Sequence, residues 1–358
     1  MEQERRISKA SELNEIVRVL LSILDLRSQD IIRRRYGLES GQIETLDSIG
    51  QEYGITRERV RQIEAQAKKM LARREDALRN IASMLEEVFA QHGGILTDDF
   101  LMLVLRKRFT DAPGATMVMF FLDILPDYER VTRSEKFRPH WSHPQLHHEY
   151  VEQVVTTADS ILRKTKNPIM EKEMLLKIRE QVAVAEEILP DACVKALLEA
   201  SKELKRTVFG EWGLRDWVET SPRGVGDKAY IVLRRNGEPM HFRDIAAQIN
   251  EVKFDHKKAH EQTVHNELIK DNRFVLVGRG MYGLSDWGFL PGTVADVLEA
   301  ILSKAGKPMK KDELLAEVMK QRMVKRTTII LGLQNNDKFA RVEDDQYTLK
   351  NANLSDIK

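Results

Sequence analysis

The stretch that decides the fold of the N-terminal part is TLDSIGQEYGITRERVRQIEAQAKKMLARR, residues Thr45 to Arg74. Apolar residues recur in it at intervals of three and four, which predicts a helix from Leu46 to Tyr53, capped by Thr45, and a second helix capped by Thr56. Gly54 stands where the first helix would end in the left-handed conformation that glycine adopts most easily. Two helices joined by such a turn are typical of a helix-turn-helix. The buried stripe predicted for the second helix is Val60, Ile63, Ala67 and Leu71.

Basic residues gather on this second helix. Residues 56–74 hold seven Lys and Arg against two Asp and Glu, although the whole chain has a formal net charge of only +1. Arg57 and Arg59 lie in the first turn, where the helix dipole disfavours cations, so a negatively charged partner is indicated. Arginine can bind guanine, glutamine can bind adenine and glutamate can accept from cytosine. The residues predicted to read base edges are Arg57, Glu58, Arg61 and Gln62. A solvated face with internal ion pairs is the alternative.

A longer stretch, RSQDIIRRRYGLESGQIETLDSIGQEYGITRERVRQIEAQAKKMLARR from Arg27 to Arg74, closely resembles region 4 of sigma-70-type bacterial sigma factors. The resemblance covers about a fifth of the chain and implies binding to the −35 promoter element and to the flap of the RNA polymerase β subunit. In its light, phosphate contacts are predicted for Arg27, Arg35, Thr45, Leu46, Arg59, Lys68 and Lys69. Tyr36 and Leu38 are expected either in the domain core or on the flap-binding surface. Only about a dozen residues precede the first predicted helix, so we expect the chain not to open a promoter by itself.

An internal repeat organises the rest of the chain. The segments LRKTKNPIMEKEML from Leu162, LRRNGEPMHFRDIA from Leu233 and LSKAGKPMKKDELL from Leu302 begin 71 and 69 positions apart. In each, a helix ends, a proline follows and a new amphipathic helix begins. A degenerate copy, FAQHGGILTDDFL, begins at Phe89. Each unit ends in two short strands around a turn, and three helices followed by a small hairpin predict a winged helix.

The predicted fold is therefore mainly α, with an N-terminal helix-turn-helix domain and a tandem array of winged-helix domains. The predicted boundaries are 1–75 for the helix-turn-helix domain, 76–148 for a degenerate winged helix, and 149–220, 221–290 and 291–358 for three further winged helices. The unit at 221–290 carries GEPMHFRDIAAQI and FVLVGRGMYGLSDWG and resembles the HARE-HTH family, which includes the N-terminal domain of some RNA polymerase delta subunits. Secondary DNA contacts, with a solvated face as the alternative, are predicted for Lys257, Lys258, Lys320, Arg322, Lys325 and Arg326.

Composition and motifs predict neither an enzyme nor a cofactor. No catalytic residue, Gly-rich phosphate loop or small-molecule substrate is indicated. One cysteine, Cys193, excludes an intramolecular disulfide. The histidines His140, His143, His147 and His148 match no familiar zinc spacing, so no metal is predicted. No apolar run approaches the length of a membrane span, and we expect a cytoplasmic, nucleoid-associated protein.

Taken together, these features predict a sequence-specific DNA-binding protein of bacterial transcription initiation. It would read a −35-type element, bind the RNA polymerase core through the β flap, or do both. The alternative is a polymerase accessory or scaffold protein, delta-like or a sigma decoy, with little direct DNA reading. A third possibility is a non-catalytic subunit of a DNA-modification system. The expected partners are thus double-stranded, promoter-like DNA and RNA polymerase, and no membrane.

Overall fold

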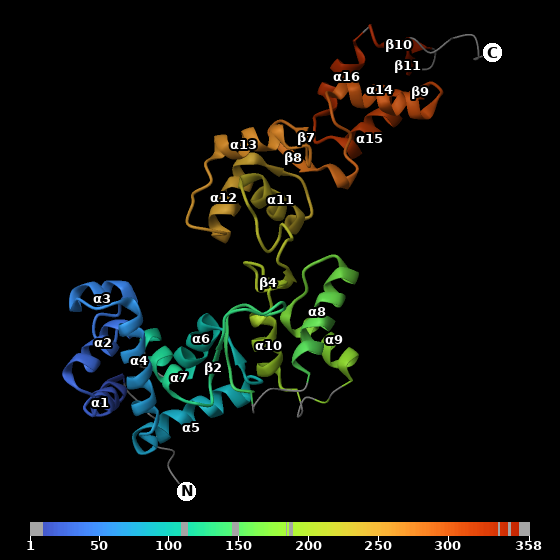
Figure 1. The fold of residues 1–358 in the computed structure, drawn as a ribbon. Coiled ribbons are helices and arrows are strands. Elements are labelled where there is room, and N and C mark those ends of the chain that lie inside the picture. The colour runs from blue at the N-terminus through green and yellow to red at the C-terminus, as the bar shows by residue number, and fades with distance from the viewer. Residues whose placement is uncertain are drawn as a thin grey trace. The chain divides into compact units, whose positions relative to one another are not determined.

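The computed structural model describes residues 10–108, 114–144, 150–183, 185, 189–335, 337–342 and 345–350. Within these ranges the chain is mainly helical with small antiparallel sheets, as predicted. It divides into two compact units, Met1–Asp216 and Trp217–Lys358, which we describe separately (Figure 1). The five smaller domain boundaries stay predictions. No helix in the described ranges is both long and apolar enough to cross a membrane.

Four helices form the N-terminal part of the first unit, which we call the head. They are α1 (Ala10–Leu21), α2 (Leu26–Tyr36), α3 (Leu46–Tyr53) and α4 (Arg57–Ala72). The side chains of Thr45 and Thr56 accept hydrogen bonds from the backbone N–H of Ser48 and Arg59, so each caps its helix. Gly54 ends α3 in the left-handed conformation at φ 63°. The predicted helix-turn-helix is therefore confirmed, together with its caps.

Packing inside the head follows the predicted pattern with one exception. Gly50 lies where α3 meets the turn, and a Cβ atom there would stand 2.8 Å from the carbonyl oxygen of Ile55. In α4, the predicted residues Val60, Ala67 and Leu71 are buried. Ile63 is only half-buried, whereas Glu64 is 9% exposed. A carboxylate thus takes a place in the stripe that the apolar pattern assigned to isoleucine.

Two winged helices complete the first unit. The first consists of α5 (Glu75–Gln91), β1 (Ile95–Leu96), α6 (Asp98–Arg108), α7 (Ala115–Ile124), β2 (Glu129–Val131) and β3 (His140–Ser142), with sheet order β1-β3-β2. The second consists of α8 (Val151–Thr165), α9 (Glu171–Val182), α10 (Asp191–Ala200), β4 (Leu204–Arg206) and β5 (Trp212–Leu214). The predicted succession of three helices and a hairpin is confirmed in both.

Two more winged helices form the second unit. One consists of α11 (Val225–Asn236), β6 (Met240–His241), α12 (Phe242–Val252), α13 (Glu261–Lys270), β7 (Phe274–Gly278), β8 (Met281–Leu284) and a 3-10 turn, η2 (Ser285–Trp287). The other consists of α14 (Val294–Ala305), β9 (Met309–Lys310), α15 (Lys311–Gln321), α16 (Arg326–Leu333), β10 (Phe339–Val342) and β11 (Gln346–Leu349).

The repeated proline is followed by a short strand, which the sequence pattern did not predict. β6 pairs antiparallel with β8, placing Met240 opposite Tyr282. β9 pairs in the same way with β11, placing Met309 opposite Tyr347. Each strand joins the start of the second helix to the hairpin, so the hairpin becomes a three-stranded sheet that packs on its own helices.

Backbone hydrogen bonds also join neighbouring winged helices within each unit. In the first unit, Phe137 forms an antiparallel bridge with Ser201. Next to it, the N–H of Lys202 donates to the carbonyl of Lys136 at 2.9 Å. In the second unit, the N–H of Met323 donates to the carbonyl of Val277 at 2.7 Å. In the second unit this bond covers part of the free edge of β7, which protects that edge from other strands.

Candidate nucleic-acid interface

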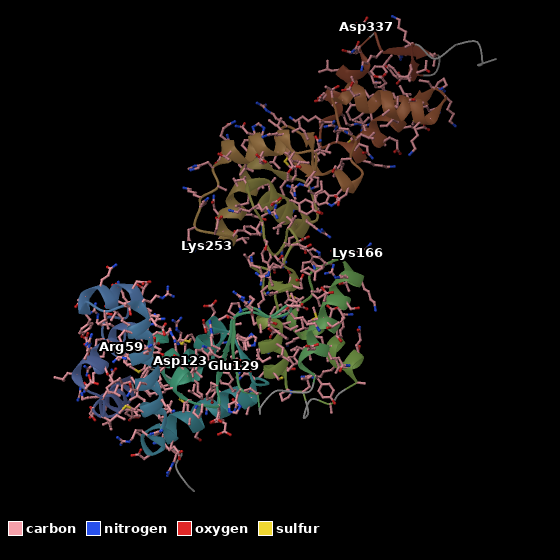
Figure 2. All side chains as sticks on the ribbon, viewed as in Figure 1. Arg59, Asp123, Glu129, Lys166, Lys253 and Asp337 are labelled. Carbon is pink, nitrogen blue, oxygen red and sulfur yellow. The ribbon has the colours of Figure 1, made fainter. Side chains whose placement is uncertain are left out.

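The residues predicted to read bases lie together on the exposed face of α4. Arg61 donates two hydrogen bonds to the Glu58 carboxylate, at 2.9 and 2.6 Å. Arg59, labelled in Figure 2, donates to the side-chain oxygen of Gln62 at 3.2 Å. Arg57 lies 3.6 Å from a carboxylate oxygen of Asp47 at the start of α3. The face is therefore solvated and internally paired in the free protein.

These pairs can open when a ligand competes for them. The side chains of Glu58 and Arg61 are 57% and 60% exposed, and ion pairs of this exposure contribute little to stability. The hydrogen bonds from Arg61 lower the pKa of Glu58, so this carboxylate remains a charged acceptor at neutral pH. The same pair presents a double donor and an acceptor side by side, which are the groups that guanine and cytosine edges complement.

Several residues predicted to contact phosphate surround this face. Thr45 and Leu46 stand at the N-terminus of α3, where backbone N–H groups favour an anion. Arg27 is exposed and lies over the ring of Tyr53 at 5.0 Å. Arg59 and Lys69 are exposed on α4. All five are accessible to a duplex that contacts the head along α3 and α4.

Two members of the predicted phosphate set are held inside the first unit instead. Arg35 donates to the carbonyl oxygen of Glu44 at 2.9 Å, and its Nε lies 3.6 Å from Glu64. Lys68 Nζ lies 2.8 Å from the carboxylate of Asp123 on α7. Both side chains are mostly covered, at 31% and 29% exposed. Both cations thus already have partners within the first unit and are less accessible to a phosphate than the exposed residues of the set.

The basic residues predicted in the second unit are mostly accessible. Lys257 and Lys258 are exposed in the segment before α13, and Lys325 is exposed immediately before α16. Lys320 pairs with Glu317 at 2.6 Å, and Arg326 pairs with Asp312 at 3.0 Å. Lys257 and Lys258 precede the third helix α13, Lys325 and Arg326 stand at the start of the third helix α16, and Lys320 lies in the last turn of α15.

Arg322 differs from the other basic residues predicted to contact DNA in the second unit. It is only 5% exposed, and its guanidinium donates to the carbonyl oxygens of Leu276 and Gly292. The chain between α15 and α16 folds back over the edge of β7, which buries this side chain between two domains. We therefore leave Arg322 out of the phosphate contacts that we propose.

The histidines set aside as metal ligands have structural contacts where they are described. His140 and His143 are each 4% exposed. His140 Nδ1 lies 2.8 Å from the carbonyl oxygen of Arg138, and burial lowers the pKa of His140. His147 and His148 lie outside the described residues. Among the described residues, no three His, Cys, Asp or Glu side chains gather as a metal site requires.

A short capped helix, a glycine turn and a second helix with an exposed polar and basic face define the class of helix-turn-helix DNA-binding domains. More particularly, residues 20–72 match the family described as sigma-70, region 4. Residues 225–287 match HARE-HTH, the helix-turn-helix domain family whose description names ASXL and restriction endonucleases. Both resemblances inferred from the sequence are confirmed for these segments.

Relatives among characterised proteins match the head. RNA polymerase sigma factor SigA1 of Synechococcus elongatus is 49% identical over 59 residues, which cover 16% of this chain and 15% of the relative. RNA polymerase sigma factor SigA of Nostoc sp. is 46% identical over 68 residues, covering 19% and 17%. SigA of Clostridium acetobutylicum is 42% identical over 59 residues, covering 16% of each. The chain thus spans less than a fifth of the length of these relatives.

Proposed function

We propose that the chain is a sequence-specific DNA-binding protein of bacterial transcription initiation. The head places α4 in the major groove of a −35-type element, with Arg57, Glu58, Arg61 and Gln62 at the base edges. The exposed face of α4 carries this proposal, because it combines base-reading side chains with an accessible helix N-terminus. The match of residues 20–72 to sigma-70 region 4 supports it.

On binding, the internal pairs of α4 are exchanged for contacts with DNA. Arg61 and Glu58 release each other and turn to guanine and cytosine edges. Arg27, Arg59 and Lys69 contact phosphates, while the N-terminus of α3, at Thr45 and Leu46, holds another phosphate through backbone N–H groups. In the second unit, Lys257, Lys258, Lys320, Lys325 and Arg326 add phosphate contacts that carry no sequence information.

The test compares two variants that remove similar groups from different helices. Glu58 and Glu15 are both exposed, and each pairs with an arginine three residues later in its helix. Full-length protein is titrated by fluorescence anisotropy with a duplex carrying a consensus −35 hexamer and with a scrambled duplex, each at two salt concentrations. Glu58→Ala should reduce the preference for the hexamer by roughly 5- to 150-fold, the range for one good base contact. Glu15→Ala should leave it unchanged. Equal behaviour of the two variants would overturn the base-reading role.

A second candidate is a polymerase-bound accessory or scaffold protein. It is favoured by Arg34, whose guanidinium is occupied by Glu44 at 2.7 Å and by Glu52, so the basic run of α2 offers less to DNA than its composition suggests. In this case the protein would bind RNA polymerase core in a pull-down, and Glu58→Ala would bind it equally well. Neither duplex would then be preferred in the anisotropy titration.

A further inference from the structure

Helix α7 occupies the position of the third helix of its winged helix, the position that reads DNA in helix-turn-helix domains. In this protein, however, α7 is largely buried. Six of the ten residues of α7 are buried, whereas two of the ten residues of α13 are buried in the corresponding helix of the second unit. An amphipathic helix with one free face carries three to four apolar residues per two turns, whereas in α7 only Ala115 is exposed. α7 therefore has no broad face to offer to a duplex.

The outward side of α7 contacts the head. The ring of Phe120 packs edge-on against Tyr36 of α2, with centroids 5.2 Å apart. One turn further on, Asp123 accepts a hydrogen bond from the Tyr36 hydroxyl and lies 2.8 Å from Lys68 Nζ of α4. Figure 2 labels Asp123 on α7. Leu71 of α4 belongs to the same apolar core as Phe120, so the contact has an apolar part and a polar part.

The polar part continues into the head. Lys68 Nζ lies 3.8 Å from Glu64, and Glu64 lies 3.6 Å from Arg35 of α2. Burial raises the pKa of the Tyr36 hydroxyl, and the hydrogen bond to Asp123 raises it further, so this group stays a donor. The C-terminal half of α4 is thus held by α2 and α7, while its N-terminal half, which carries the base-reading residues, is exposed.

We propose that the first winged helix supports the base-reading helix α4. Asp123 is a positioning residue that fixes α4 through Lys68 and Tyr36. A domain of DNA-binding architecture is used here as an intramolecular support. The proposal deepens the proposed function, on which it rests for its effect on DNA binding. The contact itself can be tested without DNA.

The competing role for Lys68 is a phosphate contact, and the two roles predict different behaviour. A lysine that neutralises a phosphate contributes about 0.9 to the slope of log K against log salt concentration. Asp123 would then be irrelevant or would weaken binding by attracting the lysine. A lysine that acts through Asp123 leaves the salt slope unchanged, and removing either partner has the same effect.

The experiment uses full-length protein carrying Lys68→Met, Asp123→Asn or both changes. Lys69→Met and Asp127→Asn are matched controls, because Lys69 is exposed on the same helix and Asp127 is exposed just after α7. Asp123→Glu keeps the carboxylate that accepts from Tyr36 and Lys68 and is the conservative variant. The first measurement is amide hydrogen exchange of residues 67–71 in α4, and the second is DNA affinity as a function of salt.

If Asp123 positions α4, each single change should accelerate exchange in α4 by about three- to tenfold, as expected for an ion pair in a partly buried network. The double change should be no worse than either single change, Asp123→Glu should keep most of the protection, and Asp127→Asn should have no effect. The DNA salt slope should be unaffected by Lys68→Met and reduced by Lys69→Met.

The proposal is overturned if Asp123→Asn leaves exchange in α4 unchanged, or if the single effects add and Asp123→Glu loses as much protection as Asp123→Asn. A reduced salt slope in Lys68→Met alone would instead assign Lys68 to phosphate. If no variant binds DNA but the exchange pattern is as expected, the proposed function is refuted, whereas the role of Asp123 in positioning α4 is supported.

Discussion

Replacing Arg322 by methionine tests the connection between the two winged helices of the second unit. The guanidinium of Arg322 donates to the carbonyl oxygens of Leu276 and Gly292, and the next residue donates its N–H to Val277 at 2.7 Å. Gly278 of β7 packs closely against this connection, since a Cβ atom at Gly278 would stand 2.6 Å from the carbonyl oxygen of Met323. Arg322→Met keeps the apolar stem and removes the donors.

The expected loss follows from these contacts. Hydrogen bonds from a charged donor contribute about 1.5–3 kcal/mol each, but part of this is offset because a buried charge is also removed. Burial lowers the pKa of Arg322, which is consistent with such a desolvation cost. We expect the connection to weaken by about 2 kcal/mol, which is roughly a 30-fold change in its opening equilibrium.

The amide of Met323 reports this opening directly, because its hydrogen bond to Val277 is part of the connection. In full-length protein, hydrogen exchange at Met323 should be roughly 30-fold faster in Arg322→Met. Lys325→Met removes an exposed cation three residues further on and should have no effect. Gly278→Ala should reproduce the effect by steric pressure. If the Met323 amide exchanges at the same rate in Arg322→Met as in the control, Arg322 does not hold the two domains together.

Three further predictions address the turn of the helix-turn-helix, the single thiol and the second unit. Gly50→Ala should lower the free energy of unfolding by about 1–3 kcal/mol in urea, because its new methyl group meets the Ile55 carbonyl at 2.8 Å. Cys193 is 1% exposed and burial raises its pKa to about 12, so its reaction with a thiol reagent at pH 8 should be slower than that of an ordinary thiol by on the order of a thousandfold, until the protein unfolds. Lys257→Ala combined with Lys258→Ala should reduce the salt slope of DNA binding by about 2 and leave the preference between duplexes unchanged.

Features that depend on neighbours in the chain were predictable from the sequence. The caps at Thr45 and Thr56 and the left-handed end at Gly54 are local preferences, and the structure has all three. The repeat located the winged helices because apolar spacing and turn residues are also local. The strands after the repeated proline were missed, since two residues such as Met240 and His241 become a strand only by pairing with β8.

Features that depend on distant residues were not predictable in the same way. Lys68 and Arg322 both belong to basic clusters in the sequence. Only the fold brings Asp123 next to Lys68 and the carbonyl group of Leu276 next to Arg322. The buried carboxylate of Glu64 left a faint signal, as a charged residue beside the apolar stripe of α4. Asp123 left none, because an acidic residue near a helix end is usually solvated.

The four third helices of the array separate into two kinds. In the first unit, six of ten residues are buried in both α7 and α10. In the second unit, only Val264 and Leu268 are buried in α13, and only Ile329 and Leu333 in α16. α7 packs on the head, and Ala196 of α10 belongs to the core that also contains α5 and α7. In the first unit the third helices α7 and α10 are apolar on most sides, and the winged helices act as internal support. In the second unit the third helices α13 and α16 remain accessible. We accordingly expect the sequence-independent DNA contacts of the array to come from the second unit.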